Sequence, residues 1–503
     1  MAEESEQSVG TRTLRGMVWA YGSYFTGRTL VLVSTAILAR LISPKEFGLV
    51  ALALTFMAFL DMLQGLGVGE ALVIEDEEEV EEKAETVFAI SVGVGFALML
   101  ATAALGPLAA SFFDQPRLVE IMPVLGVNFL LLGLGSTHYA LAQKRIDFRS
   151  RTIAEVADVV ARGGTGIVLA LAGAGVWSLV LGYVAGTLAL TIALWILVPW
   201  RPRLKPQRAH LRKLLSFGGA LTGVGFMGAI LAQFDNLVIG RQLGAEALGF
   251  YSIATRLPYL LIVNLSVVAG QVLFPAFATL AGDDMRRGFL TSLRYAVMVA
   301  LPLTAGLGIL AEPFVIGLFG DQWEGAVTAA QVLAVWALMS PIGIVCGTAF
   351  KSRGRADLQL KLAIPQAILL IVGSLLVVNE GIVAIAWVQA GIAISFTLVA
   401  IGIAQRLLGV STRSVVTAVA PPVAAAAGLA GALVAVDQLV SSPWPAIATG
   451  VGVGAVVYIG LLAVFARDTL KHLHAVAFPR PSRSELELDL LDGAAERMGT
   501  TPP

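Results

Sequence analysis

Long runs of hydrophobic residues, separated by short polar segments, make up most of this chain. A helix rises about 1.5 Å per residue, so about 20 apolar residues are needed to cross the hydrocarbon core of a bilayer. Runs of this length predict an all-α integral membrane protein with fourteen spans. The predicted spans are residues 17–39, 47–72, 86–112, 119–142, 152–173, 176–198, 214–240, 249–275, 291–314, 326–350, 358–378, 382–404, 415–436 and 446–466.

Composition supports this assignment. The 503 residues are 57% hydrophobic and 14% charged, whereas soluble domains have about 25% charged residues. The single cysteine, Cys346, excludes an intrachain disulfide and a cysteine-based metal site. The first 16 residues are polar and contain three glutamates, so no cleavable signal peptide is predicted.

The positions of Lys and Arg predict the orientation. Inside loops of membrane proteins are rich in these residues. With the N-terminus inside, only four fall in outside loops: Arg40, Lys45, Arg117 and Arg241. Three fall within spans: Arg28, Arg162 and Arg256. The remaining 27 of 34 lie inside, which predicts that both termini are cytoplasmic in a bacterial inner membrane. The acidic run Glu75–Glu85 is an inside loop, either a solvated linker or a contact for a basic partner.

An internal repeat predicts two lobes. The segment Ala39–Ala53 matches Gly240–Ala254, 201 residues later, with Arg40 over Arg241 and Gly48 over Gly249. Both segments contain outside loops, so the repeat is parallel. The basic linker between the sixth and seventh spans has six cations and suits contact with anionic lipids. The predicted organisation is an N-terminus (1–16), a six-helix lobe (17–199), the linker (200–213), a second six-helix lobe (214–405), two further helices (406–467) and a cytoplasmic tail (468–503).

Sequence motifs of enzymes are absent. The chain has no glycine-rich phosphate loop, no His-x-x-x-His or cysteine pair for a metal, and no Gly-x-Ser-x-Gly elbow. No loop is long enough for a soluble catalytic domain. We therefore expect a transporter without a metal or resident cofactor, and no nucleic-acid partner.

Polar residues within the spans are candidates for the transport site, because ionisable groups in hydrocarbon normally pair or line a substrate path. An excess of arginine favours an anionic substrate, since guanidinium pairs well with phosphate. The candidate substrate-binding residues are Arg28, Arg162, Arg256 and Asn236. Arg28 has no acidic residue at i±3 or i±4, so we expect it to contact either a ligand or Asp61.

The acidic residues are candidates for binding a proton or sodium ion, or for charge pairing: Asp61, Glu155, Asp158 and Asp235. Glu155, Asp158 and Arg162 share one helical face, and Asp158 and Arg162 could simply neutralise each other. Asp235 and Arg256 lie at similar depth and could form a static pair between the seventh and eighth spans.

The chain resembles the polysaccharide flippases of the multidrug/oligosaccharidyl-lipid/polysaccharide superfamily. The resemblance is carried by ARLISPKEFGLVALALTF, GLGVGEALV, QKRIDFRSRTIAEVADVVARGG and FDNLVIGRQLGAEALGFYSIATRLP. It implies a V-shaped pair of six-helix lobes around a cationic cavity, lined here by Arg28, Arg162 and Arg256. It also implies movement of undecaprenyl-pyrophosphate-linked oligosaccharide to the periplasmic leaflet, with a polysaccharide polymerase and export machinery as possible partners.

Two other transport functions and one enzymatic function can be compared with this pattern. A lipid II flippase would share the cationic cavity, and a cation-coupled multidrug exporter would share the fold but favour an acidic, aromatic cavity. A polymerase or ligase of the same pathway would carry a long periplasmic loop, which this chain lacks. The sequence leaves open the sugar unit, the coupling ion and the oligomeric state.

Overall fold

The computed structural model describes residues 27–65, 72, 80–145, 147–203, 232–440 and 442–465. Helices dominate this part of the chain, and it contains no strand, which confirms the all-α class. Each of the fourteen predicted spans overlaps a helix. Eleven helices in the described ranges are long and apolar enough to cross a membrane. The count of fourteen stays a prediction, because the described parts of the first and seventh spans are too short to cross a membrane and the fifth carries three charged residues.

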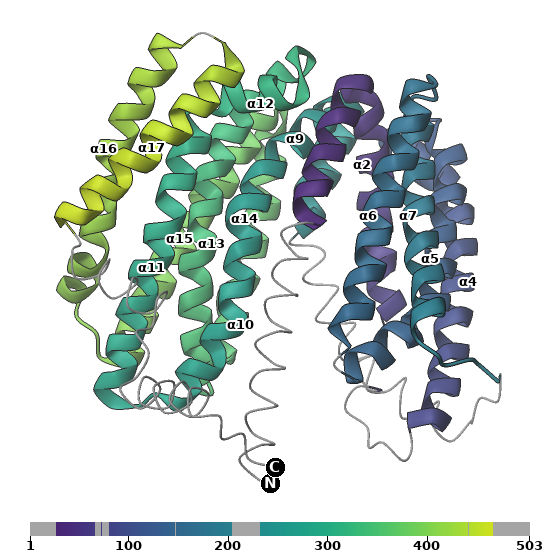
Figure 1. Ribbon diagram of the computed structural model, residues 1–503, viewed down its shortest axis with the longest axis horizontal. Coiled ribbons are helices and arrows are strands. Elements are labelled where there is room, and N and C mark those ends of the chain that lie inside the picture. Colours follow the sequence, from purple (N-terminus) through teal and green to yellow (C-terminus); the bar gives the residue numbers. More distant parts are fainter. Residues whose placement is uncertain are drawn as a thin grey trace, which may run out of the picture.

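Six helices form the N-lobe (Figure 1). They are a helix at residues 27–41, α2 (Pro44–Gly65), α4 (Val80–Phe113), α5 (Leu118–Lys144), α6 (Phe148–Leu171) and α7 (Val176–Leu197). Helices α4 and α5 pack closely because Gly95 and Gly133 each lie against the backbone of the other helix. Small residues allow this approach in membrane proteins, where close packing replaces the hydrophobic effect.

The C-lobe begins with a helix at residues 232–242 and α9 (Gly244–Pro258). A π-helical turn, η2 (Tyr259–Val263), joins α9 to α10 (Asn264–Thr279). The lobe continues with α11 (Gly282–Ile309), α12 (Ala311–Phe319), η3 (Asp321–Ala326), α13 (Val327–Ser352), α14 (Asp357–Val377), η4 (Val378–Glu380) and α15 (Ile382–Leu408). The ninth span was expected to reach residue 314, but it ends at Ile309, and Pro313 lies in the first turn of the short helix α12.

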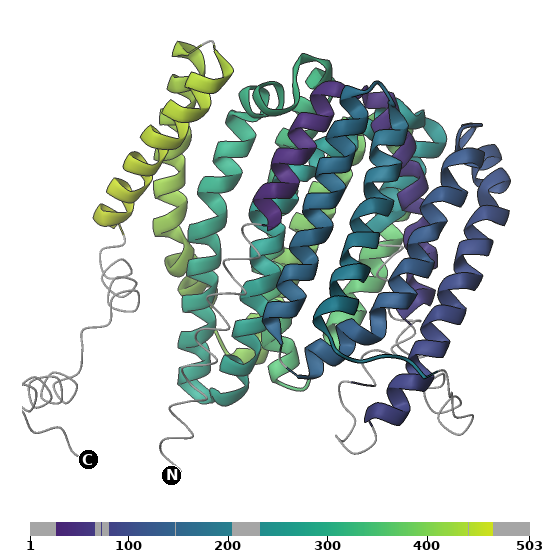
Figure 2. The ribbon, with the colours of Figure 1, turned by 45° about the vertical axis from the view of Figure 1, so that its right-hand side comes forward.

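The last two helices, α16 (Thr412–Leu439) and α17 (Pro443–Phe465), pack on the outer side of α11 (Figures 1 and 2). The side chain of Arg294 donates to the carbonyl oxygen of Ala418 on α16 at 3.1 Å. The Tyr458 hydroxyl on α17 donates to the carbonyl oxygen of Met298 at 2.7 Å. These bonds attach the pair to the C-lobe.

The start of the basic linker is anchored to the N-lobe. Trp200 is buried against Phe88 and His138, with ring centroids 5.8 and 5.3 Å away. Glu85 is the last residue of the acidic run. Its carboxylate accepts a hydrogen bond from the backbone N–H of Arg203 at 2.8 Å. The rest of the linker, most of the acidic run, the N-terminal segment and the C-terminal tail lie outside the described residues.

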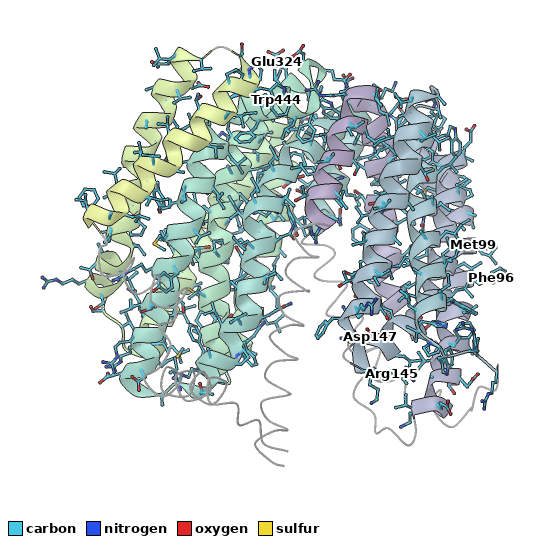
Figure 3. The ribbon with its side chains drawn as sticks, viewed as in Figure 1. Phe96, Met99, Arg145, Asp147, Glu324 and Trp444 are labelled. Atoms are coloured by element: carbon cyan, nitrogen blue, oxygen red, sulfur yellow. The ribbon has the colours of Figure 1, made fainter. Side chains whose placement is uncertain are left out.

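The two lobes meet at the ends predicted to face outside. Figure 3 labels the inside-loop residues Arg145 and Asp147 at one end of the molecule and Glu324 and Trp444 at the other. In Figure 1 the lobes are joined at the Glu324 end, near α2, α9 and α12, and the ribbons diverge toward the opposite end. One hydrophobic core contains buried residues from both lobes, including Leu52 and Tyr251.

Helices α2 and α9 cross at the two glycines that the repeat aligned. A Cβ atom on Gly48 would collide with the carbonyl oxygen of Ala245, and one on Gly249 would collide with that of Pro44. Each helix therefore approaches the other through a position that tolerates no side chain. The repeated sequence thus produces a repeated contact, and this contact holds the lobes together at the end predicted to face outside.

Candidate functional site

A cavity of about 420 Å³ lies between the lobes, next to the α2–α9 crossing. The helix at residues 27–41, α2 and α7 line it from the N-lobe. The helix at residues 232–242, α9, η2 and the first residue of α10 line it from the C-lobe. The cavity therefore depends on the relative position of the lobes, as a site for alternating access must.

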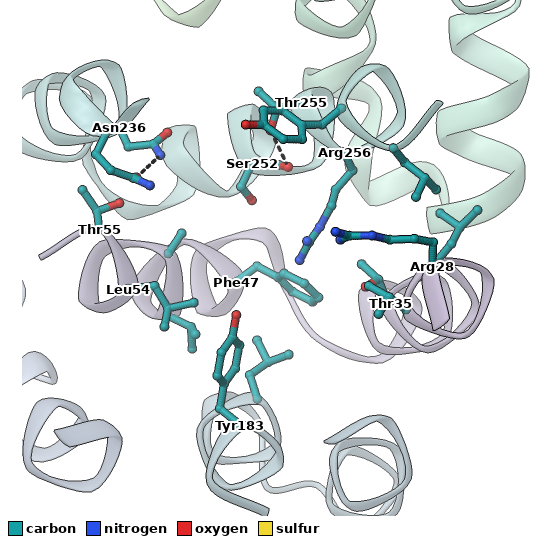
Figure 4. Close-up of a pocket in the computed structure, with 18 of the residues that line it drawn as sticks. Arg28, Thr35, Phe47, Leu54, Thr55, Tyr183, Asn236, Ser252, Thr255 and Arg256 are labelled. Atoms are coloured by element: carbon teal, nitrogen blue, oxygen red, sulfur yellow. Dashed lines mark hydrogen bonds between the residues drawn. The ribbon is translucent and has the colours of Figure 1, made fainter. Parts of the chain in front are cut away.

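Arg28 and Arg256 enter this cavity from opposite lobes. Figure 4 shows their guanidinium groups pointing toward the same region. Arg256 lies in the last turn of α9, just before Pro258 and the π-helical turn, a local irregularity often found at functional sites. Two guanidinium groups in one cavity suit an anion with several oxygens, such as a pyrophosphate. Asn236 also lines the cavity, so three of the four candidate substrate residues come together.

Arg162, the fourth candidate, lies behind the cavity wall. Its Nη2 donates to both Asp158 carboxylate oxygens at 2.8 and 3.0 Å, so the i, i+4 pairing considered from the sequence is formed. The guanidinium carbon lies 4.0 Å from the ring centroid of Tyr183, and Tyr183 lines the cavity. Glycines 182 and 186 of α7 lie against α6 at this pair.

Tyr183 was not identified from the sequence. Figure 4 shows its hydroxyl directed into the cavity. The segment GYVAG could have indicated this residue, since its two glycines are four residues apart. Such glycines allow a helix to pack closely on its neighbour, and Tyr183 lies beside that contact.

Asp235 faces away from Arg256. Its buried carboxylate, in a residue that is 5% exposed, accepts from the Tyr251 hydroxyl at 2.8 Å and the Gln389 amide at 2.6 Å. A static pair with Arg256, one interpretation of the sequence, is therefore wrong. Successive residues of a helix point about 100° apart, so Asn236 faces the cavity while Asp235 faces α15. Oδ1 of Asp235 is buried without a partner in the described part of the chain.

The other acidic candidates lie away from the cavity. Asp61 is exposed on α2, and the described residues give it no ion pair, so the pairing with Arg28 is not formed. Glu155 is exposed near the N-terminal end of α6 and accepts from the Tyr139 hydroxyl at 3.0 Å. Within the described ranges, no three His, Cys, Asp or Glu side chains are grouped as metal ligands would be.

Comparison with known proteins identifies the family. The family described as "Polysaccharide biosynthesis protein" matches residues 37–328, more than half of the chain. The chain belongs to this family. It is a multi-span membrane transporter of polysaccharide biosynthesis and not an enzyme of that pathway, as the sequence predicted.

Curated relatives span most of the chain. The succinoglycan biosynthesis transport protein ExoT of Rhizobium meliloti is 31% identical over 68% of this chain and 69% of its own. The lipopolysaccharide biosynthesis protein WzxC of Escherichia coli is 27% identical over 70% of this chain and 73% of its own.

Solved structures share the fold. The lipid II flippase MurJ in an inward closed conformation has a TM-score of 0.75 at 12% identity, covering 90% of this chain and 100% of MurJ. An inward-facing multidrug resistance MATE transporter has a TM-score of 0.60 at 19% identity, covering 76% of this chain and 96% of its own. The V-shaped, two-lobed architecture expected from the sequence is therefore confirmed.

Proposed function

We propose that this transporter moves an undecaprenyl-pyrophosphate-linked oligosaccharide from the cytoplasmic to the periplasmic leaflet of the bacterial inner membrane. The observation that carries the proposal is the convergence of Arg28 and Arg256, one from each lobe, in a single cavity. Guanidinium groups bind phosphate oxygens through strong, charge-assisted hydrogen bonds. An anionic headgroup between the two arginines contacts both lobes, so its binding depends on how the lobes are arranged.

The proposed cycle is alternating access. The lobes are joined at the end predicted to face outside and diverge toward the other end, which with the predicted orientation is the arrangement for loading from the cytoplasmic side. Release requires the α2–α9 crossing to separate. The bound pyrophosphate would contact Arg28 and Arg256, while Arg162 acts through Tyr183, whose hydroxyl faces the headgroup.

A proton or sodium gradient is the proposed driving force. Asp235 is the best placed of the acidic candidates, because its carboxylate is buried at the cavity-lining helix and has one oxygen without a partner in the described residues. Asp158 is already bound to Arg162, and Glu155 and Asp61 are exposed away from the cavity. Anionic lipids at the basic linker, and the polymerase and export machinery of the pathway, are the proposed partners.

The test is to replace Arg28 and Arg256 singly by alanine. Each variant is expected to lower surface polysaccharide at least tenfold and to accumulate the lipid-linked precursor in the inner leaflet, because pyrophosphate loses a guanidinium partner. Arg287→Ala is the matched control, since this exposed arginine pairs with Asp284 far from the cavity residues. Wild-type polysaccharide and precursor levels in both cavity variants, at equal expression, would contradict the proposal.

A lipid II flippase is the alternative, favoured by the fold shared with MurJ along 90% of this chain. Depletion of the lipid II flippase of a host strain, with this chain expressed in its place, separates the two functions. Restored growth would favour lipid II. Restored surface polysaccharide in a strain lacking only this transporter, without rescue of growth in the depletion strain, would favour the oligosaccharide substrate.

A further inference from the structure

The cavity is lined by residues that the internal repeat relates to one another. Applying the 201-residue offset to its lining residues gives five pairs in which both members face the cavity. The C-lobe members form what we call the C-lobe wall: Gln233, Asn236, Ser252, Thr255 and Arg256. Their counterparts form the N-lobe wall: Leu32, Thr35, Ala51, Leu54 and Thr55. The two walls thus occupy equivalent positions on equivalent helices.

The chemistry of the two walls differs at every pair. At the five equivalent positions the C-lobe has glutamine, asparagine, serine, threonine and arginine. The N-lobe has leucine, threonine, alanine, leucine and threonine at the same positions, in the same order. In all five pairs the C-lobe residue offers more hydrogen-bonding atoms. The backbone positions of the two walls are equivalent, so the fold itself does not require polar side chains in the C-lobe wall. The less polar residues of the N-lobe wall show that equivalent positions accept other side chains.

The hydrogen bonds of the C-lobe wall leave atoms available to a ligand. The Asn236 amide nitrogen donates to Gln233 Oε1 at 2.9 Å, which leaves the Gln233 nitrogen and the Asn236 oxygen without partners in the described residues. The hydroxyls of Ser252 and Thr255 donate to the carbonyl oxygens of Gly249 and Ser252 at 2.8 and 2.9 Å. A hydroxyl has only one hydrogen, so both oxygens remain acceptors.

We infer that the C-lobe wall binds the saccharide of the substrate and determines sugar specificity. This inference rests on the proposed function. Available acceptors on Asn236, Ser252 and Thr255 suit sugar hydroxyl donors, and the Gln233 amide suits hydroxyl or acetamido oxygens. The N-lobe wall presents mainly methyl and methylene groups. These groups pack against apolar surface and cannot form hydrogen bonds with sugar hydroxyls. The pyrophosphate bridges Arg28 and Arg256, and the sugar lies along the C-lobe.

The repeat supplies the test variants, because each C-lobe residue can be replaced by its own counterpart. Gln233→Leu with Thr255→Leu gives the C-lobe wall two N-lobe side chains. Leu32→Gln with Leu54→Thr makes the reverse change and is the matched control. Binding is measured with the purified full-length protein and two probes: undecaprenyl pyrophosphate, and the undecaprenyl-pyrophosphate-linked oligosaccharide isolated from host cells that lack this transporter.

The C-lobe double variant is expected to bind the oligosaccharide probe at least tenfold more weakly than wild type and undecaprenyl pyrophosphate within twofold. The reverse variant keeps the whole C-lobe wall and removes no hydrogen-bonding group, so it is expected to bind the oligosaccharide probe no more weakly than wild type. Equal losses on both probes, equal losses in both variants, or no loss would overturn the inference. Asn236→Thr with Ser252→Ala, a milder change, repeats the test if the first variant unfolds. Wild-type protein that binds neither probe would overturn the proposed function itself.

Discussion

The outer gate, defined as the contacts of Arg40 and Gln322 across the lobes, makes the most direct prediction about the transport cycle. Arg40 Nε donates to the carbonyl oxygen of Leu318 at 3.1 Å, and its Nη2 donates to that of Gly317. The Gln322 amide donates to the carbonyl oxygens of Ala39 and Ile42 at the end of the first helix. These bonds join the N-lobe to α12 and η3 of the C-lobe, and all must break before the cavity opens outward.

The size of the effect follows from these bonds. A hydrogen-bonding side chain contributes about 1 kcal/mol net, so Arg40→Ala with Gln322→Ala weakens the closed state by about 2 kcal/mol. Since 1.4 kcal/mol is a factor of ten, the ratio of outward-open to outward-closed protein should rise ~30-fold. The buried Trp323, whose indole N–H donates to the Ala39 carbonyl oxygen at 2.8 Å, also joins the lobes and is unchanged in this variant, so its contribution to closure is the same in both proteins.

The assay is labelling from outside with a membrane-impermeant maleimide. Cys346 is buried and is the chain's single cysteine, so Cys346→Ala with Ala51→Cys places one reactive thiol in the cavity. The gate variant should raise its labelling rate ~30-fold if opening limits the reaction. Arg117→Ala, at an outside arginine beside a separate cavity of the N-lobe, is the control and should leave the rate unchanged. A gate variant that labels at the control rate would refute the assignment of these contacts as the closure.

Three further predictions concern other parts of the structure. Gly249→Val should favour the outward-open state, because the valine side chain would collide with the carbonyl oxygen of Pro44. The same thiol assay measures this change, and labelling slower than wild type would contradict it. Asp235→Asn should abolish dependence of transport on the ion gradient while undecaprenyl pyrophosphate still binds within twofold; transport that keeps its gradient dependence would exclude Asp235 as the coupling group. Tyr183→Phe should weaken binding of undecaprenyl pyrophosphate about fivefold through loss of one hydrogen bond, and Arg162→Lys, which keeps the charge, should weaken it less than Arg162→Ala. Equal effects of lysine and alanine would show that the charge under the ring is not required.

The helices and the two-lobe plan could be predicted because they depend on properties that are local or repeated. Apolar length set the spans, and the 201-residue offset placed Gly48 and Gly249 at equivalent positions. The structure shows why both are glycines, since each faces a backbone carbonyl of the opposite helix. Hydropathy could not locate the end of the ninth span at Ile309, because α12 is also apolar and continues the hydrophobic run.

The candidate site was harder to predict, because it depends on which way each helix is turned. Asp235 and Asn236 are adjacent and at equal depth, yet one faces α15 and the other the cavity. The i, i+4 spacing shows that Arg162 and Asp158 share a helical face. The ring that separates Arg162 from the cavity belongs to Tyr183 of α7, a different helix. Side-chain direction relative to a neighbouring helix requires the packing of that neighbour, and the spacing within one helix does not contain it.

The repeat-related arginines explain how one repeat serves both closure and binding. Arg40 of the N-lobe contacts the end of α12 in the C-lobe, and Arg241 of the C-lobe lies 5.5 Å from the ring of Phe112 at the end of α4 in the N-lobe. Both arginines thus cross to the opposite lobe, so these two positions keep the two-fold relation that the cavity walls have lost. Contacts that join the lobes break when the lobes move as units, whatever the substrate, whereas asymmetric walls bind one end of the substrate to one lobe. Substitutions at the gate should therefore change transport of every substrate in proportion, and substitutions in the C-lobe wall should change the ratio between substrates.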